Sequence, residues 1–473
     1  MASVLTLNLH PRARDFPGAK SAQLASACWC ICLGAHAVTA LAAEPVRVAT
    51  FNISLYGQSA GEVLTRLQRR DDSQAQHVAE IIQRVRPDVL LLNEIDYDPG
   101  GEVLRTFCEK YLAVGQHASE SPAGPAEPIE FPYQFIAPSN TGRHSGFDLD
   151  RSGGVNAKSG AGVNAASNTD AYAADCWGYG RYEGQYAFAI LSQHPIDEAS
   201  VRTFQNFRWK DMPQAQLPDD PATPATDDWY GADALEQFPL SSKNHCDVPI
   251  TINGRRIHFL ASHPTPPVFD GPEDRNGRRN HDELRFWGDY IGGLGAGGSG
   301  LGKEDETSSY IYDDKGRHGG LGAVPKVSRD AEAERSAPPP LTPNPQPPSF
   351  ILLGDLNGDP HDGDGSHGIA ALLASPRLLN YPPPKSPGGA EQSRLQAGTN
   401  LRHRGDPSHD TCDPPDDPGP GNLRIDYVLP SADLKVSGSG VFWPAADDPL
   451  FPLVGIHPFP GSDHRLVWVD LEL

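Results

Sequence analysis

Polar side chains stand at the ends of several apolar, strand-like segments of this sequence. The clearest case is SFILLGDLNGDP, in which four apolar residues lead into Asp355 and Asn357. Side chains two residues apart on a strand point to the same face, so this carboxylate and this carboxamide are expected to meet one ligand. The pattern recurs at Asn52, Glu94, His263, Asp426 and Asp463–His464. Ligands of α/β proteins bind beyond strand ends, which indicates one shared pocket.

Three of these residues have the chemistry of hard metal ligands: Glu94, Asp355 and Asp463. Carboxylate oxygens favour Mg²⁺, Mn²⁺ or Ca²⁺. Glu94 comes shortly after four apolar residues, and a buried carboxylate without a partner is costly, so a cation is its simplest partner. A divalent ion here would neutralise a phosphate group and polarise its oxygens.

The remaining polar residues fit acid–base chemistry and phosphate binding. His464 is a natural general base, and Asp426 could orient its imidazole and stabilise the charged form. Asn52 and Asn357 could bond phosphate oxygens or the attacking water, and His263 could donate to the phosphate or the leaving oxygen. Each also has a simpler explanation, such as a strand-end turn, and Asn52 opens an Asn-Ile-Ser glycosylation sequon. Their joint occurrence favours the chemistry.

Seven short apolar segments predict the strands that would carry these residues. They are Val46–Ser54, Pro87–Ile95, Tyr186–Ser192, Arg256–Ser262, Phe350–Leu356, Leu423–Pro430 and Arg465–Leu473. Two helices are predicted, one over Ser73–Arg86 capped by Asp71 or Asp72, and one over Asn280–Ile291 capped by Asn280. Three stretches rich in Gly, Pro, Asn or Ser, residues 139–174, 292–348 and 382–420, predict long and partly mobile surface loops. The pattern predicts an α/β protein with sheets packed face to face.

Seven motifs occur in an order that resembles the endonuclease/exonuclease/phosphatase superfamily. They are ATFNI, PDVLLLNEID, GQYAFAILSQHPI, LASHPTPP, LLGDLNGDP, RIDYVLPS and GSDHRLVWVDLEL. The resemblance covers roughly residues 46–473 and extends to a subgroup of secreted bacterial members. It implies a four-layer α/β/β/α sandwich of two packed mixed sheets with outer helices, and an activated water that hydrolyses phosphoester bonds.

The resemblance also implies a role for each matching residue. Asn52 and Glu94 match the metal-site pair, and Asp463 matches the metal-side acid before the catalytic histidine. Mg²⁺, or Mn²⁺ or Ca²⁺ in its place, is the expected cofactor.

The catalytic roles follow from the same motifs. His464 matches the catalytic histidine and Asp426 the carboxylate bonded to it. Asp355 and Asn357 match the pair that positions the water and the phosphate, and His263 matches the phosphate-contacting histidine.

The motifs do not assign the substrate-contacting residues uniquely. Tyr182 and Tyr186 lie where the family often supplies a substrate-contacting aromatic or amide side chain. Arg275 and Arg279, together with Arg278 and Arg285, form the only basic cluster of the segment Pro266–Trp287. That cluster is either a binding patch for an anionic substrate or a solvated helix start.

The chain as a whole is acidic, with 473 residues and a formal net charge of −22. Such a chain does not bind nucleic acid by bulk electrostatics, so an anionic substrate needs a metal or a local basic patch. Arg12, Arg14 and Lys20 precede the apolar stretch Ala22–Leu41, and Ala40-Leu41-Ala42 fits a cleavage site. These features predict a signal peptide over residues 1–42 and a catalytic domain over 43–473. The expected localisation is secreted or periplasmic, with no membrane span after cleavage.

Four cysteines follow the predicted signal peptide: Cys108, Cys176, Cys246 and Cys412. An even number in an exported protein predicts one or two disulfides. The spacing does not fix their pairing.

The expected function is therefore a secreted, metal-dependent phosphodiesterase or phosphatase acting on a phosphorylated small molecule, with no stable protein partner implied. One alternative is an extracellular nuclease with a nucleic acid substrate. Another is a phospholipid or sphingomyelin phosphodiesterase, which would need an exposed aromatic hairpin such as Phe442–Pro444, Phe451 or Phe459. A non-catalytic binding protein is disfavoured because Glu94, Asp355, Asp426 and His464 are all present.

Overall fold

Two mixed sheets form the centre of the protein. The computed structural model describes residues 44–155, 169–292, 308–322, 348–415 and 419–473. One sheet has the order β10-β11-β1-β2-β4-β3 and the other the order β5-β6-β7-β8-β9. The strands are β1 (Val46–Leu55), β2 (Val89–Ile95), β3 (Tyr133–Ile136), β4 (Ala187–Ser192), β5 (Arg202–Thr203), β6 (His245–Ile252), β7 (Arg255–Ser262), β8 (Phe350–Asp355), β9 (Asp426–Pro430), β10 (Lys435–Val441) and β11 (Val467–Glu472).

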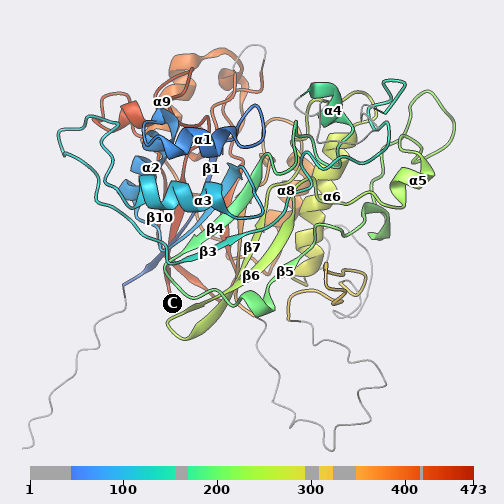
Figure 1. Ribbon diagram of the computed structural model, residues 1–473, viewed down its shortest axis with the longest axis horizontal. Coiled ribbons are helices and arrows are strands. Elements are labelled where there is room, and N and C mark those ends of the chain that lie inside the picture. The colour runs from blue at the N-terminus through green and yellow to red at the C-terminus, as the bar shows by residue number, and fades with distance from the viewer. Residues whose placement is uncertain (1–43, 156–168, 293–307, 323–347, 416–418) are drawn as a thin grey trace, which may run out of the picture. The chain divides into compact units, whose positions relative to one another are not determined.

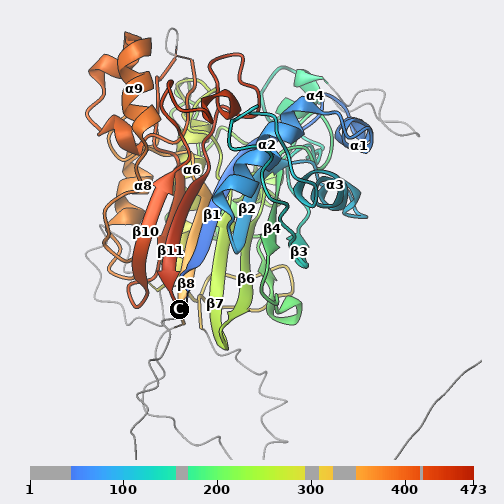
Figure 2. The ribbon, with the colours of Figure 1, turned by 90° about the vertical axis from the view of Figure 1, so that its left-hand side faces the viewer.

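The two sheets repeat one arrangement. β1 is parallel to β2, and antiparallel strands β11 and β4 flank this pair. In the second sheet β7 is parallel to β8, and antiparallel strands β6 and β9 flank them. The parallel pairs therefore end at one common end, opposite the C-terminus marked in Figures 1 and 2.

Helices cover the outer faces of both sheets. The helices α2 (Ser73–Val85) and α3 (Glu102–Phe107) lie over the six-stranded sheet, and α6 (Arg275–Tyr290) and α8 (Ser366–Leu373) lie beside the five-stranded sheet (Figures 1 and 2). The other α-helices lie in connections: α1 (Glu62–Gln68), α4 (Asp170–Ala174), α5 (Ala232–Leu235) and α9 (Pro387–Gln396). The predicted α/β/β/α sandwich is confirmed.

Strand β8 shows how the layers are built from the sequence. Its side chains alternate between faces, so Ile351 and Leu353 enter the core between the two sheets. Phe350 and Leu352 enter the second core, together with Leu284 of α6. A strand buried on both faces must be apolar throughout, which explains the run that leads into Asp355.

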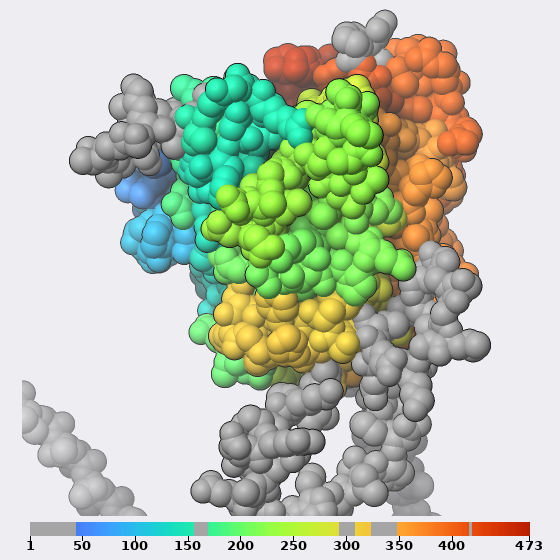
Figure 3. All heavy atoms as spheres, turned by 90° about the vertical axis from the view of Figure 1, so that its right-hand side faces the viewer, coloured from blue at the N-terminus to red at the C-terminus, as the bar shows by residue number. Residues whose placement is uncertain are grey.

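The connecting segments bury α6 from outside. Trp209 Nε1 donates to Asp282 at 2.8 Å and Tyr310 donates to Asp289 at 2.7 Å. In Figure 3 the segments around residues 200–240 and 308–322 lie side by side on this face. Acidic side chains of α6 are thereby held away from solvent and made available for internal hydrogen bonds.

Some boundaries differ from those predicted. The helix expected to start at Asn280 begins at Arg275, after Asp274 with a positive φ of 52°. Strand β6 was not predicted, because Pro249 interrupts its apolar pattern. The segment 382–420, predicted as a loop, contains α9. The helix capped by Asp72 is confirmed, with Asp72 accepting from Ala75 N at 2.9 Å.

The disulfide prediction is wrong for the described chain. Cys108, Cys176, Cys246 and Cys412 are all free and buried. Burial raises the pKa of the Cys108 and Cys412 thiols to about 12, so both stay protonated at neutral pH. The predicted signal peptide, residues 1–42, lies outside the described residues. Among those that are described, no helix is long and apolar enough to cross a membrane.

Candidate active site

The strand ends bring eight of the predicted residues to the common end of the two sheets. They are Asn52 on β1, Glu94 on β2, His263 after β7, Asp355 at the end of β8, Asn357 just beyond it, Asp426 at the start of β9, and Asp463 and His464 before β11. Asp355 and Asp426 are directly paired in register. Both sheets therefore contribute to one cluster.

Asp355 lies at the centre of this cluster. Its Oδ2 accepts from Asn52 Nδ2 at 3.0 Å and lies 3.3 Å from His263 Nε2 and 3.7 Å from His464 Nε2. Its Oδ1 accepts from Asn357 N at 3.0 Å. Burial alone would raise the pKa of Asp355, but the neighbouring histidines and the Asn52 bond hold that pKa well below its ordinary value. Asp355 is therefore an ionised acceptor facing two imidazoles.

His464 and Asp426 form a buried pair behind Asp355. His464 Nδ1 lies 2.9 Å from Asp426 Oδ2, which also accepts from Thr411 Oγ1 at 2.8 Å. Burial disfavours charge on His464, but Cys412, Asp426 and Asp355 raise its pKa well above the ordinary value. Because the Cys412 thiol is neutral, the carboxylates carry this effect. The bond at Nδ1 leaves Nε2 facing Asp355, as a general base requires.

Glu94 supplies the second carboxylate toward the cluster. It has a positive φ of 58°, and its Oε1 lies 3.9 Å from His263 Nε2. Burial, opposed by His464 and Asn52, raises the pKa of Glu94 to about 7. Oxygen atoms of Glu94 and Asp355 and a nitrogen of His263 all lie within 4.8 Å of one another. Two carboxylates this close, one of them costly to ionise, fit a divalent cation.

Asp463 and Asn357 lie at the edges of the cluster. Asp463 accepts from Ser54 Oγ at 3.4 Å, and its carboxylate groups with His464 and Cys412 within 4.8 Å. Asn357 donates through Nδ2 to Pro264 O at 3.1 Å and has a positive φ of 51°. The direct role of Asp463 in metal binding stays a prediction.

Comparison with known proteins identifies the family of this chain. A model of the Endonuclease/Exonuclease/phosphatase family matches residues 49–464. The chain belongs to this family. Members of the endonuclease/exonuclease/phosphatase family are generally phosphoester hydrolases and typically depend on divalent metals. No curated protein matches the sequence.

The chain is also similar to several solved structures. An endonuclease/exonuclease/phosphatase from Beutenbergia cavernae is 14% identical, with 91% of this chain and 72% of that chain covered and a TM-score of 0.42. Sphingomyelinase C from Streptomyces griseocarneus is 14% identical, with coverages of 90% and 99% and a TM-score of 0.38. A family protein from Bacteroides thetaiotaomicron is 11% identical, with coverages of 90% and 97% and a TM-score of 0.38.

A cavity of about 860 Å³ opens beside Glu94 and His263 of this family site. Tyr56 and Tyr186 stand at its wall with ring centroids 4.5 Å apart. The other lining residues are mostly aromatic, small or basic and include Tyr179, Tyr230, Phe238, Ser242, Lys243, Thr265, Phe269, Arg275 and Arg279. The cavity therefore joins an aromatic wall to the carboxylate cluster.

Tyr182 is not among the residues that line this cavity. It is buried, and its hydroxyl donates to the carboxylate of Asp96 at 2.7 Å and accepts from Gly57 N at 3.0 Å. It ties the loop after β1 to the end of β2. Tyr186, four residues later, takes a positive φ of 58° and lines the cavity instead.

The arginine cluster is divided among different surroundings. Arg275 lines the cavity and pairs with Glu273. Arg279 is buried beside the cavity, and its guanidinium donates to Leu240 O at 2.8 Å and Pro239 O at 3.0 Å. Arg278 faces a different cavity, and Arg285 bonds Asp282 at 3.1 Å. The four arginines are thus distributed around the axis of α6, and the predicted substrate contact of the two that line the cavity, Arg275 and Arg279, stays a prediction.

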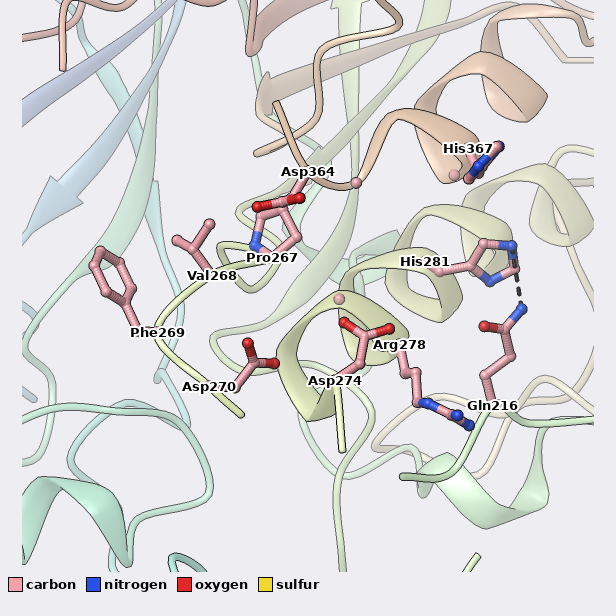
Figure 4. A pocket seen from close by; sticks show the side chains of 13 residues that line it. Gln216, Pro267, Val268, Phe269, Asp270, Asp274, Arg278, His281, Asp364 and His367 are labelled. Atoms are coloured by element: carbon pink, nitrogen blue, oxygen red, sulfur yellow. Dashed lines mark hydrogen bonds between the residues drawn. The ribbon is translucent and has the colours of Figure 1, made fainter. Parts of the chain in front are cut away.

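The cavity that Arg278 faces has a volume of about 690 Å³ and lies between the start of α6 and residues 364–368 (Figure 4). Asp270, Asp274 and Asp364 stand at one side, and His281 and Gln216 contact each other at 3.4 Å on the other. Phe269 belongs to the rims of both cavities.

Lys243, Tyr56, Ser242 and Thr265 were not predicted from the sequence. Tyr56, Ser242 and Lys243 lie in connections outside the quoted motifs, and Thr265 lies in the motif LASHPTPP, in which only His263 had indicated chemistry. The polar run Ser241–Asn244 directly precedes β6, so recognition of that strand would have placed Lys243 at the same sheet end as His263.

Proposed function

We propose that this protein is an exported, metal-dependent phosphoester hydrolase that acts on a compact phosphorylated molecule. The observation that supports it best is the ionised Asp355 carboxylate, which stands between His263 and His464 with Asp426 behind His464. This arrangement can hold a water molecule and remove its proton. The adjoining cavity is large enough for a small organic group attached to phosphorus.

Each residue has a part in the proposed hydrolysis. Asp355 Oδ2 and His464 Nε2, 3.7 Å apart, can contact the same water. His464 accepts its proton, and Asp426 stabilises the imidazolium that forms. Burial lowers the pKa of His263 to about 4, assisted by the charge of Lys243. A neutral His263 can donate one hydrogen bond to a phosphoryl or leaving oxygen.

Glu94 and Asp355 are the residues best placed to hold the cation, with Asn52 and Asp463 as the further predicted ligands. When bound, a divalent cation supplies positive charge that neutralises phosphoryl oxygens and favours attack on phosphorus. Mg²⁺ is the first candidate because both ligands are carboxylates.

The test compares four substrate classes with Mg²⁺, Mn²⁺ or Ca²⁺: an aryl phosphodiester, an aryl phosphomonoester, plasmid DNA, and sphingomyelin in vesicles. We expect turnover of a small ester that is lost on chelation. His464→Ala and Asp355→Asn are expected to lower kcat by roughly 10²–10⁴-fold. The exposed pair His117→Ala and Asp71→Asn makes the same chemical changes outside the cluster and should leave kcat unchanged.

Folded protein without turnover on all four classes would refute the proposal of a general hydrolase. Preferred cleavage of DNA would replace the small-molecule substrate by a nucleic acid. Export is tested separately, by N-terminal sequencing of the protein recovered outside the cytoplasm, where a start near Ala43 is expected.

A lipid phosphodiester is the second candidate substrate. Trp443 is buried, so the predicted hairpin around Phe442–Pro444 is unsuited to membrane contact. Phe269, however, is 86% exposed at the cavity rim. An exposed aromatic ring beside a phosphoesterase cavity can rest against lipid chains. A loss of vesicle hydrolysis in Phe269→Ser, with soluble diester hydrolysis retained, would favour this substrate.

A further inference from the structure

A buried lysine lines the active-site cavity without an acidic partner. Lys243 keeps only 6% of its surface exposed, and its Nζ donates to Pro264 O at 3.3 Å. Within the part of the chain that the structure describes, no carboxylate oxygen lies within 4.0 Å of this ammonium. An ammonium has three donors; Pro264 O accepts one of them, and burying the other two without acceptors is costly. The lysine therefore calls for an acceptor from outside the protein.

Two hydroxyl groups beside Lys243 share this property. Ser242 Oγ and Thr265 Oγ1 are buried and lack a hydrogen-bond partner within the described chain. Both residues line the same cavity as Lys243. Three side chains with donors to spare, one of them cationic, are the chemistry that binds an anion.

The backbone around these donors is held firmly. Glu283 of α6 accepts from Ser242 N at 2.7 Å through Oε1 and from Thr265 N at 2.6 Å through Oε2. Lys243 O accepts from Asn140 N at 2.9 Å. One buried carboxylate thus joins the segment before β6 to the segment after β7. Donors fixed in advance bind an anion without a cost of reorganisation.

The lysine is also close to the reacting groups. Pro264 O, which accepts from Lys243, accepts from Asn357 Nδ2 at 3.1 Å as well. Burial lowers the pKa of Lys243, while the charges of Glu283, Glu94 and Asp355 oppose that shift. The shared acceptor Pro264 O and the shared cavity place the ammonium beside Asn357 and on the cavity side of the carboxylate cluster.

We propose that Lys243, with the hydroxyls of Ser242 and Thr265, forms an anion subsite that binds the phosphoryl oxygens of the substrate. The inference rests on the proposed hydrolase function and assigns it a cationic residue outside the carboxylate cluster. Glu283 is the positioning residue of this subsite. The bound phosphoryl group would lie between Lys243 on one side and Asp355 with His464 on the other.

Binding of inorganic phosphate tests the subsite without turnover. Titration calorimetry on the full chain, with and without Mg²⁺, would compare the wild type, Lys243→Met, Lys243→Arg and the exposed control Lys435→Met. Loss of one charge-assisted contact should weaken phosphate binding roughly 10- to 100-fold in Lys243→Met. Lys243→Arg should recover part of that loss, and Lys435→Met, which changes the net charge equally, should bind as the wild type does.

A second variant covers the case in which Lys243→Met fails to fold. Ser242→Ala/Thr265→Val removes both hydroxyls and leaves the backbone bonds to Glu283 in place, and it should weaken phosphate binding several-fold. Wild-type affinity in folded Lys243→Met, or no phosphate binding by the wild type, would overturn the subsite. Phosphate binding that depends on Lys243 in a protein inactive on all four substrate classes would support the subsite and refute the hydrolase.

Discussion

At the scale of single residues, the Asp426–His464 pair governs the expected pH dependence. Asp426 helps to raise the pKa of His464, and a general base is active only when unprotonated. Activity should therefore fall as pH drops through the pKa of His464. Asp426→Asn removes the negative charge, lowers that pKa, and moves the acidic limb of the kcat/KM profile to lower pH.

The same variant should lower maximal kcat/KM by roughly 10²–10⁴-fold, because the imidazolium loses its stabilising charge. The measurement is kcat/KM from pH 5 to 10. If kcat/KM falls by the same factor at every pH and the acidic limb of the profile does not move, Asp426 only orients the imidazole of His464. Asp71→Asn, an exposed change of the same kind, is the control.

Glu94 carries a second residue-scale prediction, on stability. Folding raises the pKa of Glu94 from 4.5 to about 7. Between pH 4.5 and pH 7 the folded protein therefore keeps a proton on Glu94 that the unfolded chain has lost. The cost of burying its charge is absent below pH 4.5 and complete above pH 7. The side chain keeps 20% exposure to the cavity, which reduces that cost to about 1–3 kcal/mol.

Glu94→Gln should therefore stabilise the metal-free protein at pH 8 and change little at pH 4.5. Thermal unfolding in a chelator at both pH values measures this. Added Mg²⁺ should raise the Tm of the wild type and leave that of Glu94→Gln unchanged, because the variant loses a ligand. A Tm rise of equal size in both proteins would place the cation elsewhere.

At the scale of elements, α6 matters through its buried polar face. Glu283 bonds two backbone N–H groups that belong to different segments of the second sheet. Glu283→Gln leaves one N–H facing an amide donor, and such a buried unpaired group costs roughly 1–3 kcal/mol. Urea unfolding should show this loss, and KM for the substrate should rise as Ser242 and Thr265 loosen. The exposed Glu236→Gln should stay within about 0.5 kcal/mol of the wild type.

Elements also decide how far the sequence could predict this site. Asp355 and Asp426 could be placed because each adjoins an apolar strand, and strand ends fix direction. Arg279 could not be interpreted, because its burial depends on where α6 begins. Lys243 was not predicted because Pro249 interrupts the apolar pattern of β6, the strand that follows it. Tyr182 and Tyr186 are near neighbours in the chain, but they have different surroundings. The Tyr182 hydroxyl bonds Asp96 in the interior, whereas Tyr186, with its positive φ, lines the cavity, and the sequence does not show this backbone turn.

At the scale of the whole molecule, the candidate site belongs to neither sheet alone. Asn52 comes from the six-stranded sheet and donates to Asp355 of the five-stranded sheet. Glu94 and His263 face each other across the same boundary. The apolar core between the two sheets fixes the distance between them. That distance in turn fixes how far apart the polar residues at the strand ends of the candidate site lie.

The net charge of the molecule leads to the last prediction. With a formal charge of −22, the protein repels an anionic phosphoester until it reaches the cavity. The Debye length shrinks from about 30 Å at 0.01 M to about 10 Å at 0.1 M salt, so added NaCl screens this repulsion. We expect kcat/KM for an anionic diester to rise several-fold between about 10 and 150 mM NaCl at constant Mg²⁺. A zwitterionic diester with a quaternary ammonium group has no net charge, and its kcat/KM should stay constant. A fall with salt for the anionic ester alone would mean that the field of Lys243 and Arg275 reaches beyond the cavity mouth and outweighs the acidic surface.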